Sequence, residues 1–180
     1  TGMRQAYIDL INIQLSGTLE TLSPELDITL RHEPGWRGDS LANEMRQHAS
    51  RDVKLRSTQA GPHRADVRIE IVPKSTQTVP QPAAQVLSRG QGKVVASAMK
   101  LVQAQHLSLA MEQPSLFLID DAGAELDEEH RDRFFGMLRD QNYQILATTT
   151  DADWLLGAYP ITRVGMFHVK HGHIEPTDQQ

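Results

Sequence analysis

The chain of 180 residues is 39% hydrophobic and 23% charged, a composition typical of a soluble globular protein with a sizeable core. Its formal net charge of −5 argues against binding nucleic acid by overall charge, although a local basic patch could still do so. The absence of cysteine excludes disulfides and thiolate metal sites. No apolar run approaches the ~20 residues that cross a bilayer, and residues 1–4 begin no signal peptide. We therefore expect a cytoplasmic protein without a membrane anchor.

The first half of the chain is predicted to combine helices with antiparallel strands. Apolar residues recur every three or four positions over residues 4–22, which indicates an amphipathic helix. Residues 26–33 and 65–72 alternate apolar and polar side chains, the pattern of half-buried strands. Between them the sequence predicts a helix over residues 40–56 with Asp39 as its N-cap. Its side chains expected to face inward are Leu41, Met45, Ala49 and Val53.

Residues 73–86 contain three prolines and are predicted to form a mobile loop or an irregular hairpin. Beyond them strands and helices alternate, which predicts an α/β arrangement with a mostly parallel sheet. The expected elements are a helix over 89–111, a strand over 116–120 that is buried on both faces, a helix over 128–140, a strand over 143–149, a short helix capped by Asp151, and strands over 163–169 and 173–174. The stripe expected to be buried on the first of these helices is Val94, Val95, Ala98, Leu101, Val102 and Leu109.

Two carboxylates, Asp120 and Asp121, follow the apolar run of residues 116–119. The carboxyl end of a buried parallel strand is where open α/β sheets bind ligands. One aspartate there can hold Mg²⁺ beside the β- and γ-phosphates of a nucleotide, while the next orients or deprotonates a water. The alternative reading is that Asp121 only caps the following turn.

Residues 87–91 (LSRGQ) lead directly into the long helix of residues 89–111. A serine-capped helix start offers free N–H groups and a partial positive charge, both of which suit a phosphate, and Arg89 and Lys93 add positive charge. An ordinary capped helix start explains the same residues. Gly90-x-Gly92-Lys93 is not a Walker A loop, because that loop needs Gly-x-x-x-x-Gly-Lys-Ser/Thr.

In combination, LSRGQ, LIDD at 118–121 and AELD at 124–127 resemble the signature motif, Walker B strand and D-loop of ABC-type ATPases. GPHRAD at 61–66 and PGWRG at 34–38 make the sequence similar to the RecF family within that superfamily. The resemblance covers roughly residues 26–175. Because RecF proteins carry their Walker A loop near the N-terminus, it implies the C-terminal half of RecF, and a chain that by itself does not bind ATP tightly.

The resemblance implies an organisation and a function. Residues 1–25 would end a helical arm, residues 26–175 would form the C-terminal part of an ABC-type ATPase head, and residues 176–180 would be a disordered tail. The full-length protein would be an ATP-dependent DNA clamp in recombinational repair and replication restart. It would hydrolyse ATP slowly as an ATP-dependent homodimer, bind duplex or single-/double-strand junction DNA, and work with RecR and RecO to help load RecA at gaps.

The resemblance also assigns roles to residues. Asp120 would organise Mg²⁺, and Asp121 would act on the attacking water in place of the glutamate that most relatives have. The turn and D-loop residues that would contact the partner subunit's nucleotide or the dimer seam are Ser88, Arg89, Gly90, Gln91, Lys93 and Asp127. Relatives often carry a switch histidine where this chain has residues 148–150 (Thr-Thr-Thr), which again implies slow hydrolysis.

Contacts with DNA or nucleotide are expected from the Gly61–Arg64 turn and from a basic segment. His63 and Arg64 could approach a phosphate, or the turn could simply lead into the strand with Arg64 paired to an acid. Residues 46–74 hold seven Lys or Arg side chains against three acids, four if Glu44 is included. The segment's candidate phosphate contacts are Arg51, Lys54 and Arg56, which on the alternative reading form a solvated helix face.

Three other functions fit the motifs less well. A transporter nucleotide-binding subunit is disfavoured by the missing switch histidine, by Arg89 within the signature, and by the GPHRAD and PGWRG segments. An SMC-like structural ATPase needs hundreds of heptad residues, and residues 4–22 show only a short stripe. A catalytically inactive scaffold predicts that Asp121→Asn changes nothing.

Overall fold

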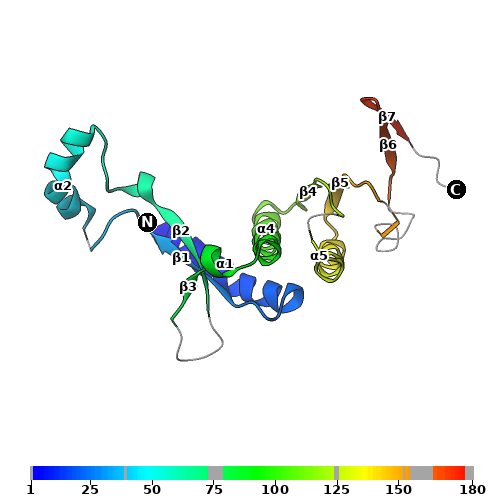
Figure 1. The fold of residues 1–180 in the computed structure, drawn as a ribbon, viewed down its shortest axis with the longest axis horizontal. Coiled ribbons are helices and arrows are strands. Elements are labelled where there is room, and N and C mark those ends of the chain that lie inside the picture. Colours follow the sequence, from blue (N-terminus) through cyan, green and yellow to red (C-terminus); the bar gives the residue numbers. More distant parts are fainter. Residues whose placement is uncertain are drawn as a thin grey trace. The chain divides into compact units, whose positions relative to one another are not determined.

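The computed structural model describes residues 2–38, 40–72, 79–123, 126–151, 153–154 and 164–176. The chain divides into two compact units, Thr1–Gln113 and Pro114–Gln180, whose main elements are labelled in Figure 1. Within the described residues, no helix is both long enough and apolar enough to cross a membrane. Each unit is described separately below.

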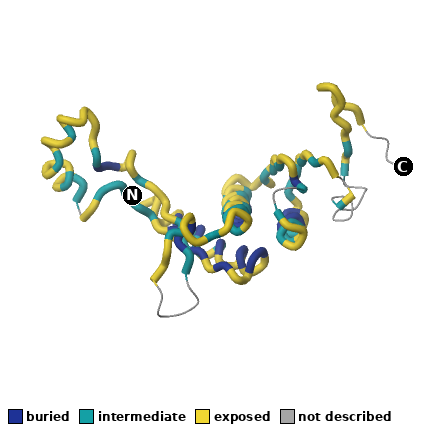
Figure 2. Tube along the Cα trace, viewed as in Figure 1, coloured by how far each residue is buried: buried dark blue, intermediate teal, exposed yellow. Residues whose placement is uncertain are grey.

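The core of the first unit lies between two long helices, α1 (Gly2–Leu22) and α4 (Arg89–Met111), which pack against each other. Both agree with the predicted bounds to within two residues. Their buried apolar residues recur every three or four positions, and those of α1 appear as dark blue segments of the tube in Figure 2. They are Ile8, Ile11, Leu15, Leu19 and Leu22 on α1, and Val94, Val95, Ala98, Leu101 and Val102 on α4. Leu109 was expected in this stripe but is 75% exposed, so that prediction was wrong.

Helix α1 also packs against a three-stranded antiparallel sheet of order β1-β2-β3. Strands β1 (Ile28–Glu33) and β2 (Asp66–Ile71) pair in register from Ile28↔Ile71 to Glu33↔Asp66. Because β1 is an edge strand, its outward backbone groups need other partners. Asn12 on α1 supplies them at Leu30: its amide donates to the Leu30 carbonyl at 2.8 Å, and its side-chain oxygen accepts from the Leu30 N–H at 2.7 Å. This side chain fixes the helix against the strand.

Helix α2 (Leu41–Leu55) forms where the sequence predicts it, but two details differ. Its N-cap is Ser40 rather than Asp39, because the Ser40 hydroxyl accepts a hydrogen bond from the Asn43 N–H. None of its residues is buried, so the inward stripe of Leu41, Met45, Ala49 and Val53 was a wrong prediction. Val53, for example, is 77% exposed. Amphipathic spacing identifies a shared face, and here no described element covers that face.

The segment predicted as a loop or irregular hairpin over residues 73–86 is ordered in its second part. Residues 81–82 form β3 (Gln81–Pro82), which pairs with β2, and residues 83–86 form the short helix α3 (Ala83–Val86). Residues 73–78 lie outside the described residues. A connection with regular structure therefore carries the chain from the sheet to the start of α4.

The second unit contains the parallel strand pair β4 (Leu116–Ile119) and β5 (Gln144–Ala147), joined through α5 (Glu128–Asp140). Helix α5 forms over the predicted residues and buries Phe134, Phe135 and Leu138. The strands were expected to be covered on both faces, but Leu116, Leu118 and Leu146 are more than half exposed. Alternate residues point to opposite faces of a sheet, and only one face is covered by described residues. A separate hairpin, β6 (Phe167–Lys170) and β7 (His173–Pro176), follows. The tail was predicted over residues 176–180, but Pro176 belongs to β7, and residues 177–180 lie outside the described residues.

Candidate functional site

Asp120 and Asp121 lie at the carboxyl end of β4, the edge predicted for ligand binding. Both side chains are exposed and therefore accessible to a ligand. The backbone turns sharply at Asp121, whose φ of 48° lies in the left-handed region. The turn is held from the neighbouring strand: the Ala122 N–H donates to the Thr148 carbonyl, and the Thr148 N–H donates to the Ile119 carbonyl, both at 2.9 Å.

The side chain of Thr148 joins the two aspartates. Its hydroxyl donates to Oδ1 of Asp120 at 2.6 Å and accepts a hydrogen bond from the N–H of Asp121 at 2.9 Å. Sequence reasoning considered Thr148 only as part of the segment that lacks a switch histidine. The signal that could have identified it is its position, since it follows β5 as Asp120 follows β4.

The two aspartates suit Mg²⁺ in their chemistry and number. Mg²⁺ prefers oxygen ligands and usually binds through one or two carboxylates together with waters and substrate phosphates. In the part of the chain that the structure describes, no group of three or more His, Asp or Glu side chains could form a complete protein cage. Thr148 engages one oxygen of Asp120, which leaves the other as a possible ligand. The site therefore fits a cation that arrives with a nucleotide.

In the first unit, the predicted turn at residues 87–91 forms the start of α4 through a complete capping box. The Ser88 hydroxyl accepts from the Gln91 N–H at 3.2 Å, and the Gln91 side chain accepts from the Ser88 N–H at 3.0 Å. Gln91 is thus used in shaping the turn. Ser88, Arg89 and Gly90 are exposed, whereas Lys93 is half-buried on the first turn of the helix. The exposed tip is the part that a phosphate could reach.

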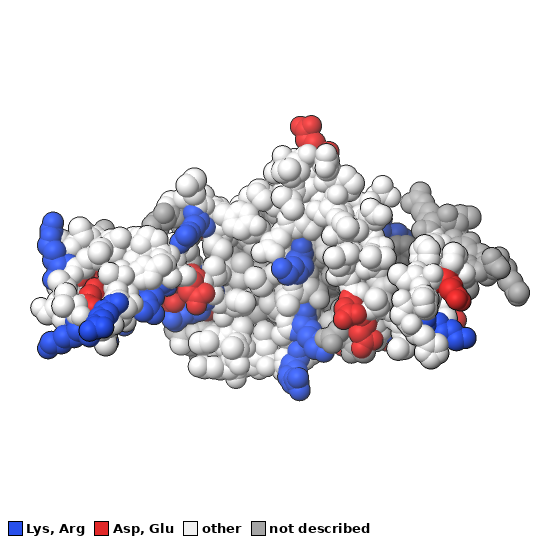
Figure 3. Space-filling view, turned by 90° about the horizontal axis from the view of Figure 1, so that it is seen from above, with Lys and Arg blue, Asp and Glu red and all other residues white. Residues whose placement is uncertain are grey.

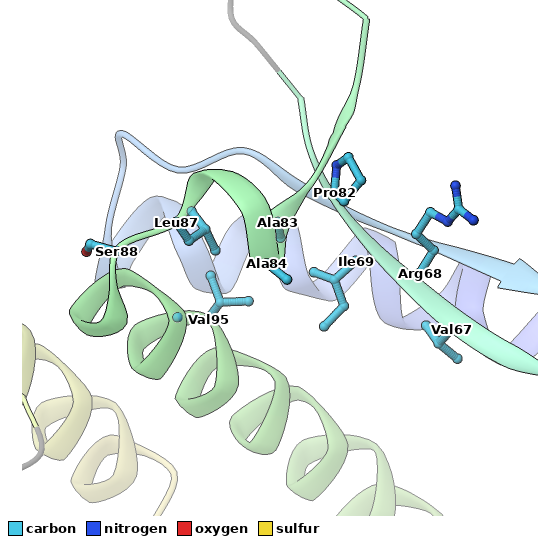
Figure 4. Close-up of a pocket in the computed structure, with 10 residues that line it drawn as sticks. Val67, Arg68, Ile69, Pro82, Ala83, Ala84, Leu87, Ser88 and Val95 are labelled. Carbon is cyan, nitrogen blue, oxygen red and sulfur yellow. The ribbon is translucent and has the colours of Figure 1, made fainter.

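A cavity of about 440 Å³ lies beside this turn, between β2, α3 and the first turns of α4 (Figure 4). Its lining is mainly apolar, and Ser88 lies at one end of the labelled set. The apolar side chains that line it include Val67, Ile69, Leu87 and Val95. Such a lining does not suit phosphate groups, so the cavity is separate in chemistry from the exposed turn.

In the second unit, Asp127 is the N-cap of α5, and its carboxylate accepts from the N–H of His130 at 3.0 Å. The His130 ring nitrogen Nδ1 lies 2.7 Å from the other carboxylate oxygen. These contacts hold the pKa of the Asp127 carboxyl below its ordinary value. The hydrogen bond from the His130 backbone N–H has the larger effect, and the hydrogen bond with the His130 ring the next largest. Asp127 remains largely exposed, so it combines a capping role with a charged surface position.

The motifs PGWRG and GPHRAD, far apart in sequence, meet in the first unit. The Gly61 N–H donates to the Gly35 carbonyl at 2.9 Å, and the guanidinium of Arg4 on α1 donates to the Pro62 carbonyl at 3.1 Å. Within the 3-10 helix η1 (Pro62–Arg64), His63 contacts the Thr58 carbonyl at 3.2 Å and Arg64 donates to Gln59 at 3.4 Å. The alternative reading paired Arg64 with an acid, whereas its described partner is the Gln59 amide. These bonds favour a structural role for the turn, although both side chains are exposed.

The predicted basic surface lies on and just after α2. Arg51 and Lys54 are exposed on the helix, and Arg56 is exposed at its left-handed C-cap. Figure 3 shows Lys and Arg side chains gathered over this part of the first unit. Two nearby acids are partly engaged with the backbone: Glu44 accepts from the Arg37 N–H, and Asp52 accepts from the Gln59 N–H. The surface can therefore contact phosphates without reading sequence.

No protein-family profile matches the chain. It is 35% identical over 176 residues to the DNA replication and repair protein RecF of Pseudomonas paraeruginosa, and this alignment covers 97% of this chain and 46% of the relative. RecF of Shewanella frigidimarina is 31% identical over 173 residues, covering 96% of this chain and 46% of the relative. The chain thus spans about half the length of the curated relatives it matches.

Solved structures share the fold at lower sequence identity. The recombination mediator protein RecF-ATP in the RecFOR pathway gives a TM-score of 0.73 at 20% identity, covering 98% of this chain and 46% of that chain. The Smc head bound to the C-winged helix domain of ScpA gives 0.60 at 14% identity, covering 96% and 43%. The fold is therefore one that RecF shares with the Smc head. In sequence as well as fold, the particular protein that the chain resembles is RecF, over its C-terminal half.

Proposed function

We propose that this chain supplies the C-terminal half of a RecF-type ATPase, an ATP-dependent DNA clamp for recombinational repair and replication restart. The observation that carries the proposal is the pair Asp120–Asp121, exposed at the carboxyl end of a parallel strand and held there by Thr148. Two carboxylates at that edge can serve a metal-bound nucleotide and a water at the same time.

Asp120 would hold Mg²⁺ with its free carboxylate oxygen. The chemistry that the bound ion would supply is neutralisation of the negative charge on the phosphates. Asp121 would orient the attacking water and accept its proton, an effect worth roughly 10²- to 10⁴-fold in rate. Because aspartate is one methylene shorter than glutamate, its water would be less favourably positioned, and hydrolysis would be slow. Slow turnover suits a switch that stays closed while ATP remains bound.

The exposed turn of Ser88, Arg89 and Gly90 would contact the γ-phosphate held by a second copy. An exposed helix N-terminus with a nearby guanidinium is suited to an anion, and Gly90 leaves its backbone open to close approach. Lys93 would add charge behind the turn, Gln91 would keep it in shape, and Asp127 would lie at the seam between copies. ATP would then close a homodimer with two composite sites.

The basic surface of Arg51, Lys54 and Arg56 would contact the phosphates of duplex or junction DNA, with His63 and Arg64 as further candidates. In the cytoplasm, RecR and RecO would direct the clamp to gaps and assist the loading of RecA. The 180 residues contain no Walker A motif, so this chain alone would be inactive as an ATPase.

The first experiment measures ATP hydrolysis by the full-length gene product with and without duplex DNA, beside the 180-residue chain. We expect slow hydrolysis that DNA accelerates, no hydrolysis by the 180-residue chain, and loss of activity on Asp121→Asn. Hydrolysis by the chain alone would show that another segment holds the phosphates. Unchanged hydrolysis in Asp121→Asn would show that Asp121 does not act on the water, and no hydrolysis by the wild-type full-length protein would favour the inactive-scaffold reading.

A second experiment tests the DNA surface. Replacing Arg51, Lys54 and Arg56 with alanine should weaken binding to all duplex sequences alike. The slope of the logarithm of the DNA-binding constant against the logarithm of the salt concentration should become less steep by about 0.9 for each lost phosphate contact. Exchanging Val53 for alanine on the same helix is the matched control, because it leaves the charge unchanged. Equal salt slopes in wild type and triple variant would place the DNA contact elsewhere.

A further inference from the structure

The Thr148 hydroxyl uses its hydrogen-bonding capacity on both aspartates of the proposed site. A hydroxyl has one proton to donate and two lone pairs to accept with. A carboxylate can only accept and an amide N–H can only donate, so the proton of Thr148 goes to Oδ1 of Asp120 at 2.6 Å, and its oxygen receives the N–H of Asp121 at 2.9 Å. One side chain therefore links the position of one carboxylate to the backbone of the other.

The register of the parallel strands puts Thr148 in this place. Ile119 is paired with Ala147, so the next residues along each chain, Asp120 and Thr148, lie side by side on the same face of the sheet. The backbone bonds from Thr148 to Ile119 and from Ala122 to Thr148 hold it on both sides of the aspartates. With its backbone fixed in this way, a β-branched side chain has little freedom to move its hydroxyl.

The bond to the Asp121 N–H also bears on an unusual backbone conformation. Asp121 has a φ of 48°, a region that non-glycine residues occupy only when their surroundings determine it. Its N–H could not be satisfied by a regular strand partner, since β4 ends at Ile119. Thr148 therefore helps to hold the turn from which the Asp121 carboxylate projects.

We propose that Thr148 is a positioning residue for phosphoryl transfer; the inference rests on the proposed function of Asp120 and Asp121. The hydroxyl holds one oxygen of Asp120 and thereby orients the other toward the metal. Through the Asp121 amide it also sets the direction of the carboxylate that acts on water. Loss of this hydroxyl should therefore affect metal affinity and turnover together, which a residue that only joins two strands would not do.

The experiment compares three variants of the full-length gene product. Thr148→Val keeps the branched shape and removes the hydroxyl, Thr148→Ser keeps the hydroxyl, and Thr21→Val, at an exposed position on α1 outside the site, is the matched control. The measurements are kcat for ATP hydrolysis, the affinity for Mn²⁺ followed by electron paramagnetic resonance with a nonhydrolysable ATP analogue, and nucleotide affinity without metal. If Thr148→Val does not fold, as judged by circular dichroism, Thr148→Ala replaces it.

We expect Thr148→Val to lower Mn²⁺ affinity and kcat by about 10- to 100-fold, the range seen when a partner of a metal ligand is removed. Nucleotide affinity without metal should be unchanged, and Thr148→Ser and Thr21→Val should stay within about threefold of wild type. Equal losses in Thr148→Val and Thr148→Ser, or no loss in Thr148→Val, would overturn the proposal.

Asp120→Asn and Asp121→Asn, assayed in parallel, separate this inference from the function on which it rests. If both aspartate variants lose activity while Thr148→Val keeps it, the ATPase assignment survives and the positioning role is refuted. If the aspartate variants hydrolyse ATP like wild type, the proposed site itself is wrong, and the role of Thr148 is refuted with it.

Discussion

Replacing Gly35 with alanine should open the contact between the PGWRG and GPHRAD segments. Gly35 has a φ of 88°, and a Cβ there would meet the Gly61 carbonyl oxygen, lie 2.6 Å from the Ala65 nitrogen and lie 2.7 Å from the Arg64 carbonyl carbon. All three are backbone atoms, so no side chain can rotate away. The Gly61 N–H to Gly35 carbonyl bond should break as the segments separate.

The free-energy cost of Gly35→Ala is the sum of two contributions. A left-handed backbone costs an alanine roughly 1–2 kcal/mol relative to glycine, and forcing atoms into a filled space costs typically about 1–3 kcal/mol. Together they give about 2–5 kcal/mol. Gly38→Ala is the matched control, because Gly38 has a φ of 69° but no atom within 4 Å of its Cβ position. That variant should show the backbone contribution alone, roughly 1–2 kcal/mol.

The assay is amide hydrogen exchange of the peptide that contains Gly61, followed by mass spectrometry. At about 1.4 kcal/mol per tenfold change, Gly38→Ala should speed local opening by about 5- to 30-fold, and Gly35→Ala by about 30- to several-thousand-fold. Fluorescence of the neighbouring, half-buried Trp36 gives a second local signal. Similar exchange in both variants would refute the argument that close backbone approach requires Gly35.

Further predictions concern the core and the caps. Leu101→Ala should lower the free energy of unfolding by about 2–5 kcal/mol because Leu101 is fully buried, whereas Leu109→Ala should change it by less than about 0.5 kcal/mol, as urea unfolding can measure. Ser88→Ala should cost about 1 kcal/mol by removing the N-cap of α4, with faster exchange of the Gln91 amide as the direct readout. Asp127→Ala should destabilise α5 at pH 7. Since folding lowers the pKa of Asp127, its stabilisation is present above the unfolded value near 4 and lost as pH falls through the folded pKa. The difference between wild type and Asp127→Ala should therefore shrink at pH 3, and an equal difference at both pH values would contradict this cause.

The helices were predictable because their signals are local. The bounds of α4 and α5 follow from a capping residue, Ser88 or Asp127, and from apolar side chains at helical spacing. The same spacing also placed α2 correctly in the chain. The error there concerned burial, because periodicity shows which side chains share a face but not whether another element covers it.

For the strands, too, the position in the chain was predictable but the burial was not. The apolar run of residues 116–119 predicted a strand, and its parallel pairing with β5 followed from the alternation of strands and helices. Coverage on both faces did not follow, since Leu118 is 71% exposed among the described residues. A run of apolar residues indicates that a strand is stable when it is buried. It does not show which other elements cover the two faces of that strand.

The sequence by itself determined the order of the elements and the chemistry of the candidate site. Short motifs carried that information, because LSRGQ and LIDD place particular side chains at a helix start and a strand end wherever the elements lie. Only the tertiary structure decided that Thr148 joins Asp120 to Asp121, and that Gly35 packs against Gly61. Such contacts depend on strand register and on the distance of closest approach between backbones. Both are set by packing between residues far apart in the chain, which no local pattern specifies.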